Sequence, residues 1–152
     1  MGISAHLDDF LERHRSIGID TSVLIYAVEA HPKYLPLAQQ VLRWAFGPRG
    51  RLVTSTITMT EALVRPYRSG NRVLVQEFHA LLVTYPHLDW IAPSLQIADR
   101  AAQLRADHNL RTPDAIQAAT ALAAGVTGFI TNDPAFRRVE SLEILVIDDL
   151  LS

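Results

Sequence analysis

Residues 112–134, TPDAIQAATALAAGVTGFITNDP, contain a helix followed by a strand, the repeating unit of an α/β protein. We predict that residues 113–124 form the helix, with Thr112 as its N-cap and Pro113 at the first helical position. Gly125 is suited to ending this helix, because glycine readily adopts the left-handed conformation found there. Residues 128–131 are then predicted to form a short buried strand.

The same alternation extends along the rest of the chain. Strands are predicted over residues 16–19, 51–54, 88–91, 128–131 and 142–147. Helices are predicted over residues 22–29, 35–46, 59–67, 73–85, 95–107 and 113–124, with a single helical turn at 134–137. Strands that alternate with helices favour an α/β fold with a mainly parallel central sheet of about five strands flanked by helices.

The length of 152 residues fits one ordinary domain. Hydrophobic residues make up 49% of the chain and charged residues 20%, so the chain can bury a core. Residues 1–15 are predicted to form an extra amphipathic helix, with Leu7, Phe10 and Leu11 on its apolar face. We therefore divide the chain into an N-terminal extension, residues 1–15, and a single domain, residues 16–152.

Composition excludes several kinds of site. The chain has no cysteine, which excludes disulfides, thiolate zinc sites and cysteine nucleophiles, and favours a reducing, cytoplasmic location. The histidines show no HExxH motif, so a histidine-based zinc site is not expected. No apolar run approaches the length of a membrane span, and we expect no membrane association. The net charge of −2 gives no signal for nucleic-acid binding.

Four carboxylates lie at the ends of predicted strands or the starts of predicted helices: Asp20, Glu61, Asp114 and Asp133. Each has a purely structural interpretation when taken alone. Asp20 and Asp133 could cap helices, and Glu61 could form a capping box with Thr58. Asp114 could simply favour the dipole of its helix.

The four carboxylates together favour a different interpretation. In an open parallel sheet, ligands bind outside the carboxyl ends of the strands. Asp20 and Asp133 follow strands directly, and helix starts such as those of Glu61 and Asp114 can face the same crevice. Oxygen ligands of this kind suit Mg²⁺ or Mn²⁺ rather than zinc or copper. The sequence therefore predicts a cation site built from these four residues.

Four segments resemble the motifs of a known family, and they do so in the order in which that family has them. They are residues 17–26 (IGIDTSVLIY), 58–63 (TMTEAL), 111–119 (RTPDAIQAA) and 129–136 (FITNDPAF). Together they resemble the PIN domain family over residues 17–150. A compact PIN domain with little else is similar to the VapC-type toxins of bacterial toxin–antitoxin pairs, which often begin closer to the first strand.

The resemblance implies a Mg²⁺- or Mn²⁺-dependent endoribonuclease that hydrolyses RNA phosphodiester bonds. Such a toxin is expected to form a homodimer and to be silenced by a small antitoxin protein that blocks the acidic pocket. We expect Asp20 and Asp114 to be the direct metal ligands, and Glu61 and Asp133 to complete the catalytic site. Exposed aromatic residues at Trp44 and Phe46 would suit such a protein partner.

Several further residues have two interpretations. Ser22 and Thr131 could orient a carboxylate or a metal-bound water, but Ser22 could equally be an N-cap and Thr131 an ordinary strand residue. Arginines near the predicted site could hold RNA phosphates, although a solvated surface explains each of them as well. These arginines are Arg65, Arg68, Arg111 and Arg137.

Two other functions fit parts of the sequence. A phosphatase of the haloacid dehalogenase type would need a second aspartate where Ser22 stands, and a downstream lysine, whereas Lys33 is the only lysine. That function is excluded. The remaining alternative is a non-catalytic interaction module that keeps the PIN fold.

Overall fold

The computed structural model describes residues 3–151, so Met1, Gly2 and Ser152 lie outside the described part of the chain. The strands are β1 (Ser16–Ile19), β2 (Arg51–Ser55), β3 (Leu88–Ile91), β4 (Gly128–Thr131) and β5 (Glu143–Val146). The helices are α1 (Ile3–Arg13), α2 (Thr21–Val28), α3 (Leu35–Trp44), α4 (Ile57–Ser69), α5 (Arg72–Thr84), α6 (Leu95–His108) and α7 (Thr112–Ala123). Two 3₁₀ helices follow, η1 (Pro134–Arg138) and η2 (Ile147–Leu150).

The strands form one five-stranded sheet in the order β3-β2-β1-β4-β5. All four neighbouring pairs are parallel, with Ile17 opposite both Leu52 on β2 and Gly128 on β4. The predicted α/β fold with a parallel sheet is thus confirmed. From β1 the chain builds one side of the sheet through β2 and β3, and then crosses back to add β4 and β5. The carboxyl ends of β1 and β4 therefore flank the point at which a ligand crevice is expected.

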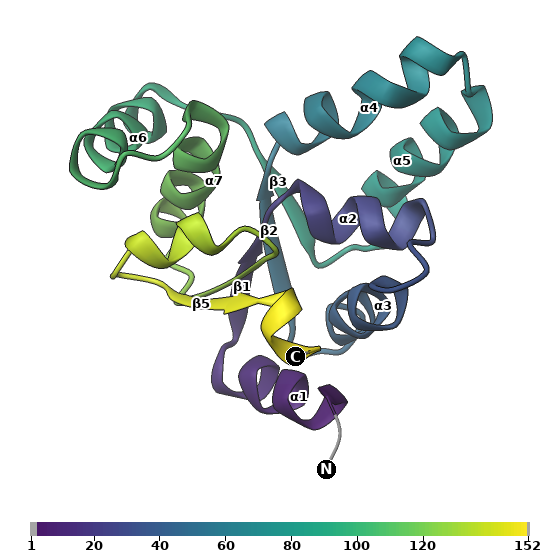
Figure 1. The fold of residues 1–152 in the computed structure, drawn as a ribbon, viewed down its shortest axis with the longest axis horizontal. Coiled ribbons are helices and arrows are strands. Elements are labelled where there is room, and N and C mark those ends of the chain that lie inside the picture. The colour runs from purple at the N-terminus through teal and green to yellow at the C-terminus, as the bar shows by residue number, and fades with distance from the viewer. Residues whose placement is uncertain (1–2, 152) are drawn as a thin grey trace.

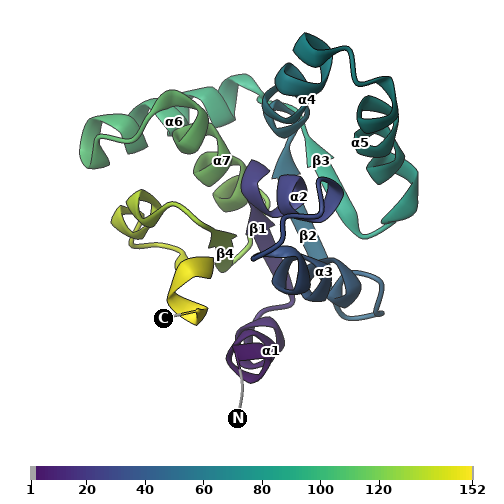
Figure 2. The same ribbon diagram turned by 45° about the vertical axis from the view of Figure 1, so that its right-hand side comes forward.

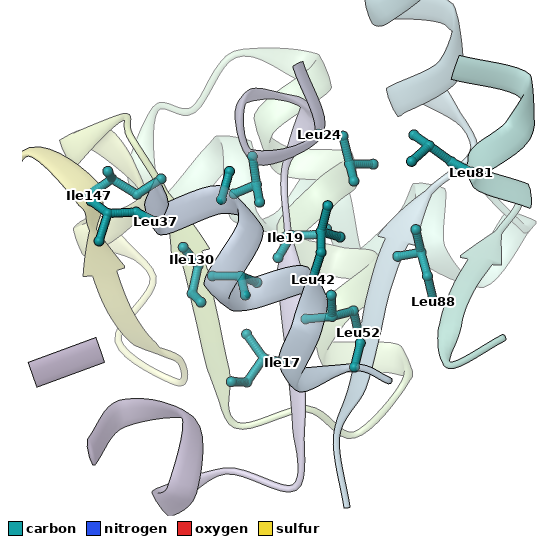
Figure 3. Close-up of a cluster of buried hydrophobic side chains, with 14 of the residues drawn as sticks. Ile17, Ile19, Leu24, Leu37, Leu42, Leu52, Leu81, Leu88, Ile130 and Ile147 are labelled. Atoms are coloured by element: carbon teal, nitrogen blue, oxygen red, sulfur yellow. The ribbon is translucent and has the colours of Figure 1, made fainter. Parts of the chain in front are cut away.

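Helices cover both faces of the sheet, with α6 and α7 on one face and α2 and α3 on the other (Figure 1). Side chains alternate along each strand, so Ile17 and Ile19 on β1 face the first of two buried clusters, formed with α1 to α5 (Figure 3). The second cluster lies against α6 and α7 and includes Val53 and Phe129. Helices α4 and α5 extend side by side away from the sheet (Figures 1 and 2).

Gly18, between the two isoleucines of β1, allows α7 to pack closely on the sheet. A Cβ atom at this position would lie 2.6 Å from Cδ2 of Phe129 and 2.9 Å from Cβ of Ala121 on α7. Contacts this short would force the helix or the phenylalanine to move. Because α7 also carries Asp114, the glycine helps to hold that carboxylate beside the carboxyl end of β1.

The predicted N-terminal helix is present as α1, and its apolar residues Leu7, Phe10 and Leu11 are buried in the first cluster. The division of the chain at residue 16 stays a prediction. Among the residues that the structure describes, no helix is long and apolar enough to cross a membrane.

Several predicted boundaries were wrong by one or two residues, among them the start of α7 and the extent of the last strand. Helix α7 begins at Thr112, and Arg111 occupies the cap position without a side-chain hydrogen bond, so Thr112 is not the N-cap. The backbone of Arg111 is extended, with φ −66° and ψ 153°. The last predicted strand is also shorter than expected, because the chain turns into η2 at Ile147.

Candidate active site

A pocket of about 380 Å³ lies at the carboxyl ends of β1 and β4. All four predicted carboxylates line it: Asp20, Glu61, Asp114 and Asp133. Asp20 follows β1 and Asp133 follows β4, whereas Glu61 and Asp114 come from the early turns of α4 and α7. The structure thus brings together four acids that are widely separated in the sequence, at the place where the sheet topology predicts a ligand site.

Asp20 is the most firmly held of the four. Its Oδ1 accepts hydrogen bonds from the backbone N–H of Ser22 at 3.1 Å and from the Ser22 hydroxyl at 2.5 Å. Its Oδ2 accepts one from the Thr131 hydroxyl at 2.6 Å. Asp20 is therefore the N-cap of α2, and the interpretation of Ser22 as the cap was wrong. Both hydroxyls instead contact the carboxylate, one on each oxygen.

The surroundings of two of the carboxyl groups, those of Asp20 and Asp114, favour their neutral forms. Although Asp20 as a residue is only partly buried, its carboxyl is enclosed by protein, and this desolvation raises its pKa from 3.8 to about 6. The hydrogen bonds from Ser22 and Thr131 oppose this rise, and the charge of Asp114 adds to it. Desolvation also raises the pKa of Asp114, despite the neighbouring guanidinium of Arg111. A bound cation would favour the charged forms of both groups.

Glu61 is held differently from the prediction. Because α4 begins at Ile57, Thr58 lies inside the helix and does not cap it. The capping-box interpretation was therefore wrong. The Glu61 side chain instead accepts a hydrogen bond at 2.7 Å from the hydroxyl of Thr21, the residue that follows Asp20.

Arg111 contacts two of the acids. Its Nε donates to Oδ2 of Asp114 at 3.1 Å, and its Nη2 lies 3.9 Å from Oδ2 of Asp133. The arginine side chain is 76% exposed, so it can leave these carboxylates without breaking a buried contact. Asp133 also caps η1, because it accepts a hydrogen bond from the backbone N–H of Ala135 at 2.9 Å.

The other predicted RNA-binding arginines lie elsewhere. Arg65 and Arg68 are exposed on α4, and Arg137 pairs with Asp149. None of the three is among the described residues that line the pocket.

Sequence reasoning missed Thr21 and Gln117 as residues of the site. The available signal for Gln117 was its position among the alanines of α7, because a large polar side chain on an apolar helical face needs a buried partner. The sequence did not indicate which residue that partner is, because Thr58 on α4 is far from α7 in the chain.

The chemistry of the pocket suits a hard cation, because carboxylate oxygens are the ligands that Mg²⁺ and Mn²⁺ prefer. Within residues 3–151, however, no three acidic or histidine side chains converge closely enough to hold a metal ion between them. Asp20 faces Ser22 and Thr131, and Asp114 faces Arg111. The oxygen ligands therefore fit a hard cation, on the condition that Asp114 gives up its contact with Arg111 and binds the cation instead.

Comparisons with known proteins identify the family of the chain. The model of the PIN domain matches residues 17–142, a range that includes all four carboxylates. No curated protein sequence matches the chain.

Solved structures share the fold. A toxin–antitoxin complex from Klebsiella pneumoniae is 26% identical, with a TM-score of 0.64, over 86% of this chain and 97% of that one. The VapC20 toxin of Mycobacterium tuberculosis, described as cleaving the sarcin–ricin loop, is 20% identical, with a TM-score of 0.65, over 81% and 94% of the two chains. VapBC-1 from nontypeable Haemophilus influenzae is 22% identical, with a TM-score of 0.62, over 88% and 98%. From the family match over most of its length, and from the fold that surrounds the four carboxylates, we conclude that this chain belongs to the PIN domain family.

Proposed function

We propose that this protein is a Mg²⁺- or Mn²⁺-dependent endoribonuclease that hydrolyses RNA phosphodiester bonds, and that it is the cytoplasmic VapC-type toxin of a toxin–antitoxin pair. One observation carries the proposal: carboxylates from four separate segments line a single pocket at the carboxyl ends of the strands. Four unrelated helix caps would be expected to scatter over the surface. The likeness to the toxin–antitoxin complex from Klebsiella pneumoniae supports the same function.

In this proposal Asp20 and Asp114 would hold the cation directly, and Glu61 and Asp133 would complete the site. When bound, the cation activates a water for attack near neutral pH and neutralises charge that develops on the phosphoryl group. Ser22 and Thr131 position Asp20, since each donates a hydroxyl proton to one of its oxygens.

Arg111 has a second role in the proposed reaction. With Asp114 holding a cation, the exposed guanidinium of Arg111 would no longer be paired with that carboxylate, and it could contact an RNA phosphate beside the pocket. Arginine suits this contact because its planar guanidinium can donate two parallel hydrogen bonds to phosphate oxygens.

The proposed partner is a small antitoxin, with a homodimer as the form of the toxin. Asp114 and Asp133 already contact one arginine, so an arginine from an antitoxin could occupy the same acids and block the pocket. Apolar side chains suited to protein contacts are exposed on α4 and α5, and on the loop after α3: Val64, Tyr67, Val73, Leu82, Val83 and Phe46. Trp44, by contrast, is partly buried against the first cluster.

Co-expression with the product of the neighbouring small reading frame tests this partner. The proposal expects a stable complex and suppression of toxicity. A protein that is harmless when expressed alone, and that binds nothing encoded beside it, would refute the toxin assignment.

The alternative is a non-catalytic PIN-fold interaction module, and the contact of Arg111 with two of the acids is the observation that favours it. Incubation of the purified protein with total RNA in Mg²⁺, Mn²⁺ or EDTA separates the two. The endoribonuclease should cleave only with metal, and Asp114→Asn should remove cleavage while leaving the protein folded. Absence of cleavage by the wild type under every metal condition would favour the module.

A further inference from the structure

A buried polar cluster lies beneath the carboxylates and is not part of the proposed chemistry. Thr54, Thr58 and Gln117 are each no more than 2% exposed. The Gln117 amide nitrogen donates to the Thr58 hydroxyl at 2.7 Å, and its amide oxygen accepts from the backbone N–H of Ser55 at 3.2 Å. The Thr58 and Thr54 hydroxyls lie 2.7 Å apart, and that of Thr54 donates to the carbonyl of Ile19 at 2.9 Å.

These contacts determine the position of each proton in the cluster. Because Thr54 gives its only proton to the Ile19 carbonyl, Thr58 must be the donor to Thr54. Thr58 then accepts from Gln117, whose amide orientation is fixed by the Ser55 N–H. In the 3.5 Å contact between Thr21 and Thr58 the Thr21 hydroxyl is the donor, but the same hydroxyl lies only 2.7 Å from a carboxylate oxygen of Glu61. Because Thr58 already accepts from Gln117, the single proton of Thr21 goes to the nearer oxygen of Glu61.

The hydrogen bond between Gln117 and Thr58 also joins the two helices that carry site carboxylates. Gln117 follows Asp114 by three residues on α7, and Thr58 precedes Glu61 by three residues on α4. Residues three apart lie on the same side of a helix. The hydrogen bond thus links α4 and α7 about one turn from each carboxylate.

We propose that Gln117 and Thr58 are positioning residues, which set the placement of Glu61 relative to Asp114 and thereby the affinity of the pocket for a divalent cation. This inference rests on the proposed function. Loss of a partner that orients a metal ligand typically weakens metal binding by about 10- to 100-fold. Thr58 reaches Glu61 through Thr21 rather than directly, so a loss at the lower end of this range, about 10-fold, is expected when its hydroxyl is removed.

The experiment measures the binding of Mn²⁺ to the purified full chain by titration calorimetry, together with the melting temperature in EDTA. Thr58→Val keeps the shape of the side chain but removes the hydroxyl, and Thr58→Ser keeps the hydroxyl. Thr120→Val is the matched control. Thr120 is buried like Thr58 and lies on α7 like Gln117, but its hydroxyl donates to the Ile116 carbonyl of its own helix and does not join α7 to α4. Gln117→Met is a second variant that keeps the length of the side chain without its amide.

We expect Thr58→Val and Gln117→Met to bind Mn²⁺ about 10-fold more weakly, and Thr58→Ser to bind it almost as the wild type does. Thr120→Val should keep the wild-type affinity. Variants that fold, melt lower and bind Mn²⁺ like the wild type would overturn the positioning role and leave the proposed function standing. A wild type that does not bind Mn²⁺ would overturn both. Failure of both network variants to fold, with Thr120→Val folded, would show that the cluster serves folding instead.

Discussion

Replacing Asp20 by asparagine should stabilise the metal-free protein at neutral pH. Asparagine caps helices as well as aspartate does, so the start of α2 should be preserved. The change removes a charge that the folded protein disfavours, because the pKa of Asp20 rises from 3.8 to about 6 on folding. One pKa unit corresponds to about 1.4 kcal/mol, so the ionised carboxylate costs up to about 3 kcal/mol. For a chain of this length, each kcal/mol changes the melting temperature by about 2–4 °C.

The sign of the effect depends on pH. A group whose pKa is raised on folding contributes stability below its unfolded pKa, and that stability is lost as the pH rises through the folded value. For Asp20 this loss falls between pH 3.8 and about 6. The variant should therefore melt several degrees above the wild type in EDTA at about pH 7.5, and the gap should shrink towards pH 4.

Calorimetric melts in EDTA across this pH range test the reasoning. Asp9→Asn is the control, because Asp9 is exposed on α1, which precedes β1 and so lies at the opposite end of that strand from Asp20. The control should show no such gap. If Asp20→Asn melts below the wild type at neutral pH, or if its gap does not change with pH, then burial of the Asp20 charge is not the cause that we assign.

Three further predictions concern the pocket and the sheet. Arg111→Ala should bind Mn²⁺ more tightly than the wild type in calorimetric titrations without RNA, because Asp114 no longer pairs with the guanidinium; an unchanged or weaker affinity would contradict this. Mn²⁺ affinity of the wild type should fall as the pH drops through about 6 and Asp20 takes up a proton, whereas a flat profile would exclude Asp20 as a ligand. Gly18→Ala should lower the unfolding free energy by about 1–3 kcal/mol, measured by urea denaturation, because its Cβ would clash with Phe129; unchanged stability would show that α7 can shift freely.

The fold could be predicted from the sequence because its strands are buried on both faces. Such strands appear as short apolar runs between helical segments, and Gly128–Thr131 is one of them. The gathering of the four carboxylates could be predicted for a related reason. Residues such as Asp20 and Asp133 follow parallel strands, and the carboxyl ends of parallel strands meet at one edge of the sheet.

The contacts of each carboxylate could not be predicted, because they depend on side chains that are distant in sequence. The local pattern around Glu61 indicated a capping box with Thr58. Helix α4 begins at Ile57, however, so Thr58 lies inside the helix. Its hydroxyl contacts Thr54 and Gln117 instead of capping the helix. The pairing of Arg111 with Asp114 likewise depends on an extended backbone at Arg111, which the expected cap at Thr112 did not indicate.

The most direct test of the account is the location of Mn²⁺ by anomalous diffraction from crystals grown with the metal. The account predicts an anomalous peak in the pocket within bonding distance of Asp20 and Asp114, with Arg111 no longer paired to Asp114. Asp114→Asn crystals should show a weaker peak or none. A pocket without a peak at saturating Mn²⁺, in which Arg111 still contacts Asp114, would contradict the claim that these carboxylates form a metal site.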